Sequence, residues 1–185
     1  MNDLADLKAQ ARKQAFARRK EAFEAAGKAQ AGYLSEVLAG HRGVPLSGFW
    51  PIRTEIDPLP AMEEAAAHGP VAVPYIVGKG EALKFARWEP DCALVEGAFG
   101  AMVPAELDFI EPEILIVPLV AFDLKGGRLG YGGGFYDRTL ESLRAKRATL
   151  AVGFAFAAQE AASLPLEATD QTLDMIVTES GIITV

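Results

Sequence analysis

The sequence predicts an α/β fold, a single-domain three-layer αβα sandwich with a mostly parallel central sheet and a long N-terminal helix. The run Ile114–Val117 is apolar at every position, as expected for a strand that is covered on both faces in a parallel sheet. Along the rest of the chain, helix-forming stretches alternate with short apolar runs. The length of 185 residues suits one domain, and no repeat or linker divides it, so we expect a single domain over residues 1–185.

The N-terminal part predicts two helices, then a strand and a third helix. Residues 3–39 are rich in Ala, Lys, Arg, Glu and Leu and contain no proline, which favours a long basic helix over about residues 3–30 and then a short one. The apolar run Leu46–Trp50 is ended by Pro51 and predicts a strand, and residues 62–67 predict a helix that ends before Gly69.

The remaining elements follow from β-branched and aromatic runs and from one further helical stretch. Gly78–Gly80 predicts a turn between two strands, because apolar runs rich in strand-forming residues flank it. We expect strands at 71–77, 83–88, 114–117, 149–156 and 175–178, and a helix at about 135–146.

The composition excludes several classes of protein. The longest apolar stretch, Ile114–Phe122, is far shorter than the roughly 20 residues that cross a bilayer. The N-terminus lacks the apolar segment of a secretory signal, so we expect a cytoplasmic protein with no membrane partner. The single cysteine, Cys92, cannot form an internal disulfide, and we interpret it as structural.

The charge is distributed unevenly along the chain. The formal net charge is −7, yet residues 1–30 hold seven Lys and Arg against four Asp and Glu. Residues 31–185 hold eleven against twenty-one. Binding of nucleic acid needs a broad basic surface, so we expect no nucleic-acid partner. The basic N-terminal residues 1–30 could still bind a small anion.

A glycine-rich segment, Gly126–Asp137, lies between a predicted buried strand and a predicted helix. A loop that leads into a helix offers free backbone N–H groups to an anion, and glycine lets that backbone approach a phosphate closely. Arg128 and Arg138 bracket the loop and can contact phosphate oxygens, and Asp137 can hold a magnesium ion. The alternative is a tight turn that binds no ligand.

Two better-known glycine motifs do not fit this loop. No Gly-Lys-Ser or Gly-Lys-Thr closes it, so it is not a Walker-type phosphate loop. A dinucleotide fingerprint that begins at Gly130 would need glycine or alanine where Phe135 stands, and no acidic residue near position 155 could hold a ribose.

The loop resembles the signature of the 5-formyltetrahydrofolate cyclo-ligases, G-x-G-x-G followed by two aromatic residues and Asp. The matching residues are Gly130, Gly132, Gly134, Phe135, Tyr136 and Asp137. Lys8 and Arg12 have the family's K-x-x-x-R spacing, Phe49–Glu55 is similar to its substrate-contacting segment, and Leu173-Asp174 is similar to its late acidic site. The resemblance covers nearly the whole chain.

The resemblance implies an ATP- and Mg²⁺-dependent enzyme that converts 5-formyltetrahydrofolate into 5,10-methenyltetrahydrofolate and releases ADP and phosphate. Its partners are then small molecules, and we expect a monomer or weak homo-oligomer. Such a reaction depends on positioning and on neutralising phosphate charge more than on a protein nucleophile.

The same resemblance implies roles for individual residues. Arg128 and Tyr136 are the expected catalytic residues, and Trp50, Glu55 and Tyr136 the expected folate contacts. Asp137 and Asp174 are the expected metal ligands. The expected ATP-binding residues lie on the first helix and in the glycine loop: Lys8, Arg12, Gly130, Tyr131, Gly132, Gly133, Gly134, Phe135, Asp137 and Arg138.

For several of these residues a purely structural role, without ligand binding, remains possible. Lys8 and Arg12 lie on one face of a helix, which could simply be solvated. Trp50 could belong to the core, and Asp137 and Asp174 could be cap or turn residues. Some family members have lysine where this chain has Gly133, so Arg128 or Arg138 would have to supply that charge. A different nucleotide- or sugar-phosphate-binding enzyme and a non-catalytic protein of this fold remain the competing hypotheses.

Overall fold

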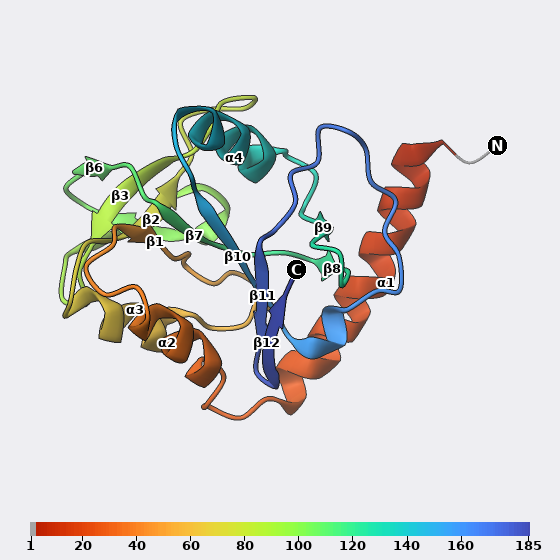
Figure 1. Ribbon diagram of the computed structural model, residues 1–185, viewed down its shortest axis with the longest axis horizontal. Helices are drawn as coiled ribbons and strands as arrows, with labels where there is room; N and C mark the ends of the chain where they lie inside the picture. Colours follow the sequence, from red (N-terminus) through yellow and green to blue (C-terminus); the bar gives the residue numbers. More distant parts are fainter. Residues whose placement is uncertain (1–2) are drawn as a thin grey trace.

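The computed structural model describes residues 3–185 and is built around one eight-stranded sheet (Figure 1). The strand order is β12-β11-β10-β7-β1-β2-β3-β6. The strands of this sheet are β1 (Leu46–Ser47), β2 (Val71–Tyr75), β3 (Lys84–Trp88), β6 (Phe109–Ile110), β7 (Ile114–Val117), β10 (Leu150–Phe154), β11 (Met175–Thr178) and β12 (Gly181–Thr184).

The five central strands, from β11 to β2, are parallel to one another, and antiparallel strands close both edges. The register places Ile114 of β7 between Leu46 of β1 and Leu150 of β10. The predicted fold class, with a mostly parallel central sheet, is confirmed.

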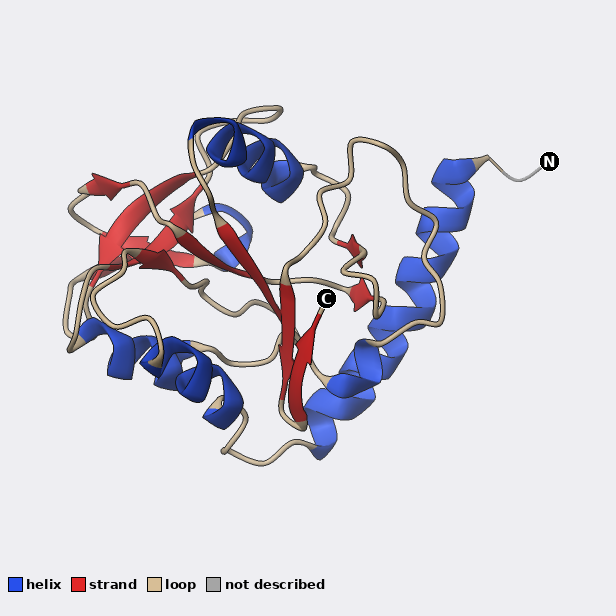
Figure 2. Ribbon diagram, viewed as in Figure 1, coloured by secondary structure: helices blue, strands red, loops and turns tan. Residues whose placement is uncertain are grey.

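Helices cover both faces of the sheet, as Figure 2 shows. In β7, Ile114 and Ile116 pack into the core under α2 (Gly32–Ala39) and α3 (Leu59–Ala66). Leu115 and Val117 point to the other face and pack with Leu140 and Leu143 of α4 (Phe135–Lys146). Successive side chains of a strand alternate between faces, so the uniformly apolar sequence of β7 serves two cores at once.

The first helix, α1 (Leu4–Ala25), lies beyond the end of the sheet (Figure 1). Ala15 packs there against Val120, Ala121 and Leu129 in a third, smaller core. The helix ends earlier than the expected residue 30, because Ala26 adopts an extended backbone conformation and Gly27 follows it.

Short strands account for most of what the sequence did not predict. The strand expected over residues 46–50 is paired only at Leu46 and Ser47. Two small hairpins and two edge strands were missed altogether, because runs of two to four residues carry little periodicity. The hairpins are β4 (Leu94–Glu96) with β5 (Met102–Pro104), which flank the 3₁₀ turn η1 (Ala98–Gly100), and β8 (Ala121–Phe122) with β9 (Arg128–Leu129). The missed edge strands are β6 and β12.

Candidate active site

Three loops meet at the carboxyl edge of the central sheet. Trp50–Glu55 follows β1, the glycine loop Gly126–Gly134 follows β7, and residues 155–174 follow β10. β1, β7 and β10 are neighbouring parallel strands, so their carboxyl ends, and the loops that begin there, lie at one edge of the sheet. The third loop contains the 3₁₀ turn η2 (Ala157–Gln159), and α1 contacts η2 and β8.

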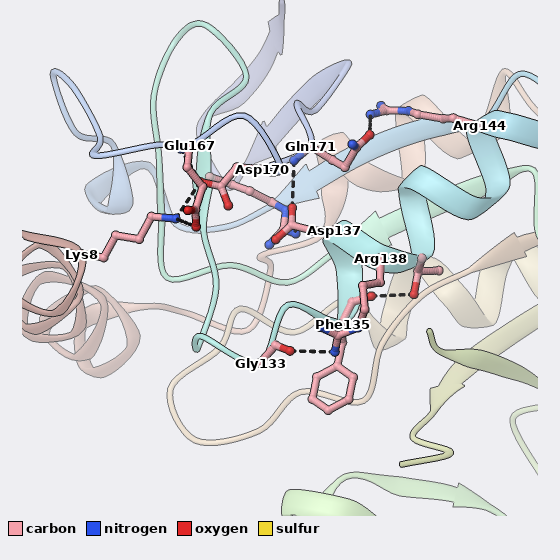
Figure 3. A network of polar contacts seen from close by, with 11 residues as sticks. Lys8, Gly133, Phe135, Asp137, Arg138, Arg144, Glu167, Asp170 and Gln171 are labelled. Atoms are coloured by element: carbon pink, nitrogen blue, oxygen red, sulfur yellow. Dashed lines mark hydrogen bonds and ion pairs between the residues drawn. The ribbon is translucent and has the colours of Figure 1, made fainter. Parts of the chain in front are cut away.

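The glycine loop has the backbone shape of an anion-binding turn. Gly132 and Gly134 have φ values of 103° and 68°, which glycine adopts without strain. Gly134 is the N-cap of α4 and brings no capping side chain, so first-turn N–H groups of the helix stay open toward the loop. Arg138 lies over this turn and donates from Nη2 to the Gly133 carbonyl oxygen at 2.7 Å (Figure 3).

The buried face of α1 presents basic side chains to these loops. Arg12 donates from Nε to the Gly130 carbonyl oxygen at 2.7 Å. Lys8 donates from Nζ to Glu167 and Asp170, at 2.8 Å each (Figure 3). Burial alone would lower the pKa of Lys8, but the hydrogen bonds and negative charges of these two carboxylates together raise it. Lys8 and Arg12 therefore contact the loops of the site and do not form a merely solvated face.

Arg128 and Asp137 form a buried ion pair at the start of α4. Asp137 Oδ1 accepts from Arg128 Nη2 and from the Gln171 backbone N–H, both at 2.9 Å. Burial lowers the pKa of Arg128, and the charges of Asp137, Tyr136 and Asp170 oppose that shift. Arg128 Nε is buried and has no hydrogen-bond partner among the described residues, so the guanidinium keeps a donor for a ligand.

Glu55 is a buried carboxylate, 5% exposed, beside the glycine loop. Its Oε2 accepts from the Ile52 N–H at 2.9 Å and its Oε1 from the Tyr131 hydroxyl at 3.0 Å. Burial raises the pKa of Glu55, and these two hydrogen bonds and the charges of Arg19 and Arg53 only partly offset the shift. Burial and the neighbouring Glu55 raise the pKa of Tyr131 to about 12.

The Tyr136 hydroxyl is buried and has no hydrogen-bond partner within residues 3–185. Burial raises its pKa, and the charge of Glu55 adds to the shift while Arg128 opposes it. The hydroxyl therefore lies within the field of both groups. A buried hydroxyl without a partner is costly, so a native structure that keeps one needs a reason, and a ligand that bonds the hydroxyl is such a reason.

Trp50 is half-buried and belongs to none of the hydrophobic clusters, whereas its neighbour Phe49 does. The structure places Trp50 on the loop that ends at Glu55, but within residues 3–185 its ring makes no aromatic or cation–π contact with another site residue. Its part in folate binding stays a prediction.

The hydrogen-bond partners of the Asp174 side chain lie outside the glycine loop, although the N–H of its neighbour Leu173 donates to the Gly126 carbonyl oxygen at 2.8 Å. Asp174 Oδ2 accepts from Arg144 at 3.0 Å and from the Ala151 N–H at 2.8 Å, at the amino ends of β10 and β11. Arg144 stands in the last turn of α4, and Asp137 in its first turn, about 10 Å apart along the helix axis at 1.5 Å per residue. Asp137 and Asp174 thus bond partners at opposite ends of α4, and their sharing of a metal stays a prediction.

Asp170 is a second carboxylate linked to the Arg128–Asp137 pair. The next residue, Gln171, bonds Asp137, and the charge of Asp170 acts on Arg128. Within residues 3–185 no group of three or more His, Cys, Asp or Glu side chains is arranged to hold a metal. Mg²⁺ typically binds one or two carboxylates together with substrate phosphates, so the pair Asp137 and Asp170 fits a magnesium ion that arrives with a nucleotide.

Sequence reasoning missed Arg19, Glu167 and Asp170. Arg19 follows Lys8 by eleven residues, which is three helical turns, so the spacing could have placed it on the same face of α1. Glu167 and Asp170 lie in an irregular segment without periodicity, and no pattern distinguishes Asp170 from Asp174 as the acid that faces the site.

None of the helices in the described part of the chain is both long and apolar enough to cross a membrane.

A family model described as the 5-formyltetrahydrofolate cyclo-ligase family matches residues 5–179. A 5-formyltetrahydrofolate cyclo-ligase of Haemophilus influenzae is 44% identical over 101 residues, 51% of this chain and 54% of that protein. The chain thus matches about half the length of that relative. The Escherichia coli K12 protein of the same name is 36% identical over 138 residues, 69% of this chain and 74% of that protein.

Two solved structures share the fold. The 5,10-methenyltetrahydrofolate synthetase of Aquifex aeolicus aligns with a TM-score of 0.72 and 30% identity, covering 96% of this chain and 92% of its own. The synthetase of Mycoplasma pneumoniae aligns with a TM-score of 0.67 and 20% identity, covering 93% and 98%, and supports the fold alone. The predicted family and enzyme class are confirmed: the chain belongs to the 5-formyltetrahydrofolate cyclo-ligase family.

Proposed function

We propose that this protein catalyses the ATP- and Mg²⁺-dependent cyclisation of 5-formyltetrahydrofolate to 5,10-methenyltetrahydrofolate, with release of ADP and phosphate. The observation that carries the proposal is the meeting of two chemically different half-sites at one edge of the sheet. Lys8, Arg12 and the glycine loop form a cationic cradle that suits phosphates. Glu55 beside it is a buried carboxylate that suits the N–H groups of a pterin.

The reaction requires activation of a poor leaving group. The formyl oxygen attacks the γ-phosphorus of ATP, the bond from that phosphorus to the bridging oxygen breaks, and ADP leaves. The neighbouring folate nitrogen then attacks the formyl carbon and loses its proton, which ends on the phosphate, and the carbon–oxygen bond breaks as that phosphate departs. Both steps move negative charge among phosphate oxygens, so catalysis depends chiefly on positioning and electrostatic stabilisation.

Each group of residues in the site has a separate role in this reaction. Lys8 and Arg12 bind phosphate oxygens, and the open N–H groups at the start of α4 hold the transferred group. Arg128, with its unpaired Nε, neutralises charge on that group. The Tyr136 hydroxyl, which has no partner within residues 3–185, donates to the formyl oxygen or to the phosphoryl group. Asp137 and Asp170 would hold magnesium, when bound, and the ion would neutralise charge on the phosphates.

Formation of methenyl-folate absorbance tests the proposal directly. The purified protein would be mixed with 5-formyltetrahydrofolate, ATP and magnesium, and compared with mixtures that lack ATP or magnesium. Growth of the absorbance only in the complete mixture is the expected result. Binding of ATP without binding of the folate would instead favour a different nucleotide-dependent enzyme, and turnover independent of ATP would contradict the proposed chemistry.

Magnesium dependence distinguishes the three acidic residues near α4. Asp137→Asn and Asp170→Asn are expected to raise the magnesium concentration for half-maximal rate by about tenfold, since each removes a charged ligand. Asp174→Asn, the matched control, is expected to leave that concentration unchanged but to lower the melting temperature, because it weakens the bonds to Arg144 and Ala151. If only the Asp174 variant needed more magnesium, the result would contradict the choice of Asp170 and favour Asp174 as the metal ligand, as expected from the sequence.

A further inference from the structure

The least expected charged group in the structure is Arg19 of α1, which is 1% exposed. Its Nη1 donates to the Tyr131 hydroxyl at 2.8 Å and its Nε to Thr54 Oγ1 at 3.0 Å. The guanidinium also lies over the rings of Phe16 and Tyr131, at 5.0 and 5.5 Å. It forms no ion pair with a carboxylate within residues 3–185, and its Nη2 has no partner there. Burial of an unpaired charge is costly, so this arrangement calls for a functional reason.

The Tyr131 hydroxyl connects Arg19 to Glu55. It accepts a hydrogen bond from Arg19 and donates one to Glu55 Oε1 at 3.0 Å. A direct salt bridge would have covered one edge of the carboxylate. With the hydroxyl between them, each Glu55 oxygen accepts only one bond, from Ile52 or from Tyr131, and keeps a second acceptor position open.

We propose that Arg19 is a positioning residue of the folate half-site, which holds Tyr131 and, through it, keeps the buried Glu55 carboxylate oriented and charged while its free acceptor positions face the substrate. The inference rests on the proposed function, since it assigns the recognition of the folate to Glu55. Tyr131 belongs to the glycine loop and Thr54 to the loop after β1, so Arg19 also fixes the two half-sites relative to each other.

The charged and titratable groups that affect Glu55, or that Glu55 affects, lie on four elements. Arg19 is on α1, Arg53 is on the same loop as Glu55, Tyr131 is in the glycine loop, and Tyr136 is in α4. Burial raises the pKa of Glu55, and Arg19 and Arg53 are the cations that oppose the shift. Removal of Arg19 therefore raises the pKa of Glu55 further, and the carboxylate then stays protonated up to a higher pH.

Folate binding and ATP kinetics of three variants test the role of Arg19. Arg19→Gln and Tyr131→Phe are each expected to weaken binding of 5-formyltetrahydrofolate about tenfold at pH 7, as for loss of one hydrogen bond to a charged group. The loss from Arg19→Gln should grow as the pH falls and shrink as it rises, while the KM for ATP stays within about twofold of the wild type. Arg19→Lys, which keeps the charge, should restore most of the pH profile.

A double variant and a neighbouring arginine complete the experiment. Arg19→Gln with Tyr131→Phe should lose about as much folate affinity as either change alone, because both break one chain of bonds. Arg18→Gln is the matched control, since Arg18 is the adjacent arginine and bonds only the Ala158 carbonyl oxygen at the surface. Tyr131→Phe keeps the ring that packs on Arg19 and so tests the chain even if Arg19→Gln does not fold.

Where the variants bind the folate more weakly than the wild type, two results would overturn the inference. One is an equal loss of folate and ATP affinity without any change in pH profile, which would make Arg19 a structural anchor of α1. The other is a double variant whose losses multiply, which would show that Arg19 and Tyr131 act separately. If the wild-type protein itself binds no formyl folate, the proposed function fails as well. If the wild type binds it and the variants bind it equally, the inference alone fails.

Discussion

Replacement of Glu55 by glutamine is expected to remove folate recognition and to leave the protein at least as stable as the wild type. Each hydrogen bond from a pterin N–H to the charged carboxylate contributes about 1.5–3 kcal/mol, so loss of two such bonds should raise the KM for 5-formyltetrahydrofolate about 100-fold or more. The amide oxygen of glutamine can still accept from Ile52 or Tyr131, so the loop should keep its shape.

The effect of this change on stability has a definite sign. The pKa of Glu55 is raised in the folded protein, so the folded state binds a proton more readily than the unfolded state does. Ionisation of Glu55 therefore lowers the stability of the wild type as the pH rises from the usual glutamate range near 4.5 through the raised pKa. Glutamine cannot ionise, so the melting temperature of the variant should match that of the wild type at pH 4 and equal or exceed it at pH 7.

Steady-state kinetics and melting curves between pH 4 and 8 measure both effects. Glu63→Gln is a suitable control, because Glu63 is exposed on α3 and lies outside the site. A parallel rise in the KM values for folate and ATP, together with a lower melting temperature, would indicate a folding defect and contradict the assignment of Glu55.

A strand that packs into the core on both of its faces, or a helix with a clear pattern of helix-forming residues, could be predicted from the sequence. β7 and α4 lie at the expected residues, because an uninterrupted apolar run and a strongly helical stretch each allow one interpretation. The order of the strands was not predictable. It places the loops after β1 and β7 side by side, and this adjacency of neighbouring parallel strands creates the site.

Site residues were predictable where a motif fixes their spacing, and not where tertiary contacts choose among similar residues. The glycine loop and its Asp137 follow from local sequence. Asp170 and Asp174 are both acids of one irregular segment, and only the packing of that segment along α4 decides which of them lies near Asp137. Arg19 could be recognised only once the buried face of α1 was known.

Removal of the Tyr136 hydroxyl is expected to change activity and stability in opposite directions. Tyr136→Phe keeps the ring beside Arg128, at 5.8 Å from its guanidinium carbon, and removes a buried hydroxyl that has no partner in the described structure. A buried polar group without a hydrogen bond costs about 1–3 kcal/mol, so the variant should be as stable as the wild type or more stable by about 1 kcal/mol. The melting temperature reports this directly.

The same substitution should slow turnover strongly. A hydroxyl that donates to oxygen atoms as they gain charge stabilises the transition state more than the bound substrates, so kcat should fall about 100-fold with little change in the KM for ATP. Tyr33→Phe is the control, since Tyr33 is exposed on α2. Full activity with a lower melting temperature would mean that the Tyr136 hydroxyl serves packing. Lower activity with unchanged or greater stability would mean that the fold keeps an unsatisfied group because the reaction uses it.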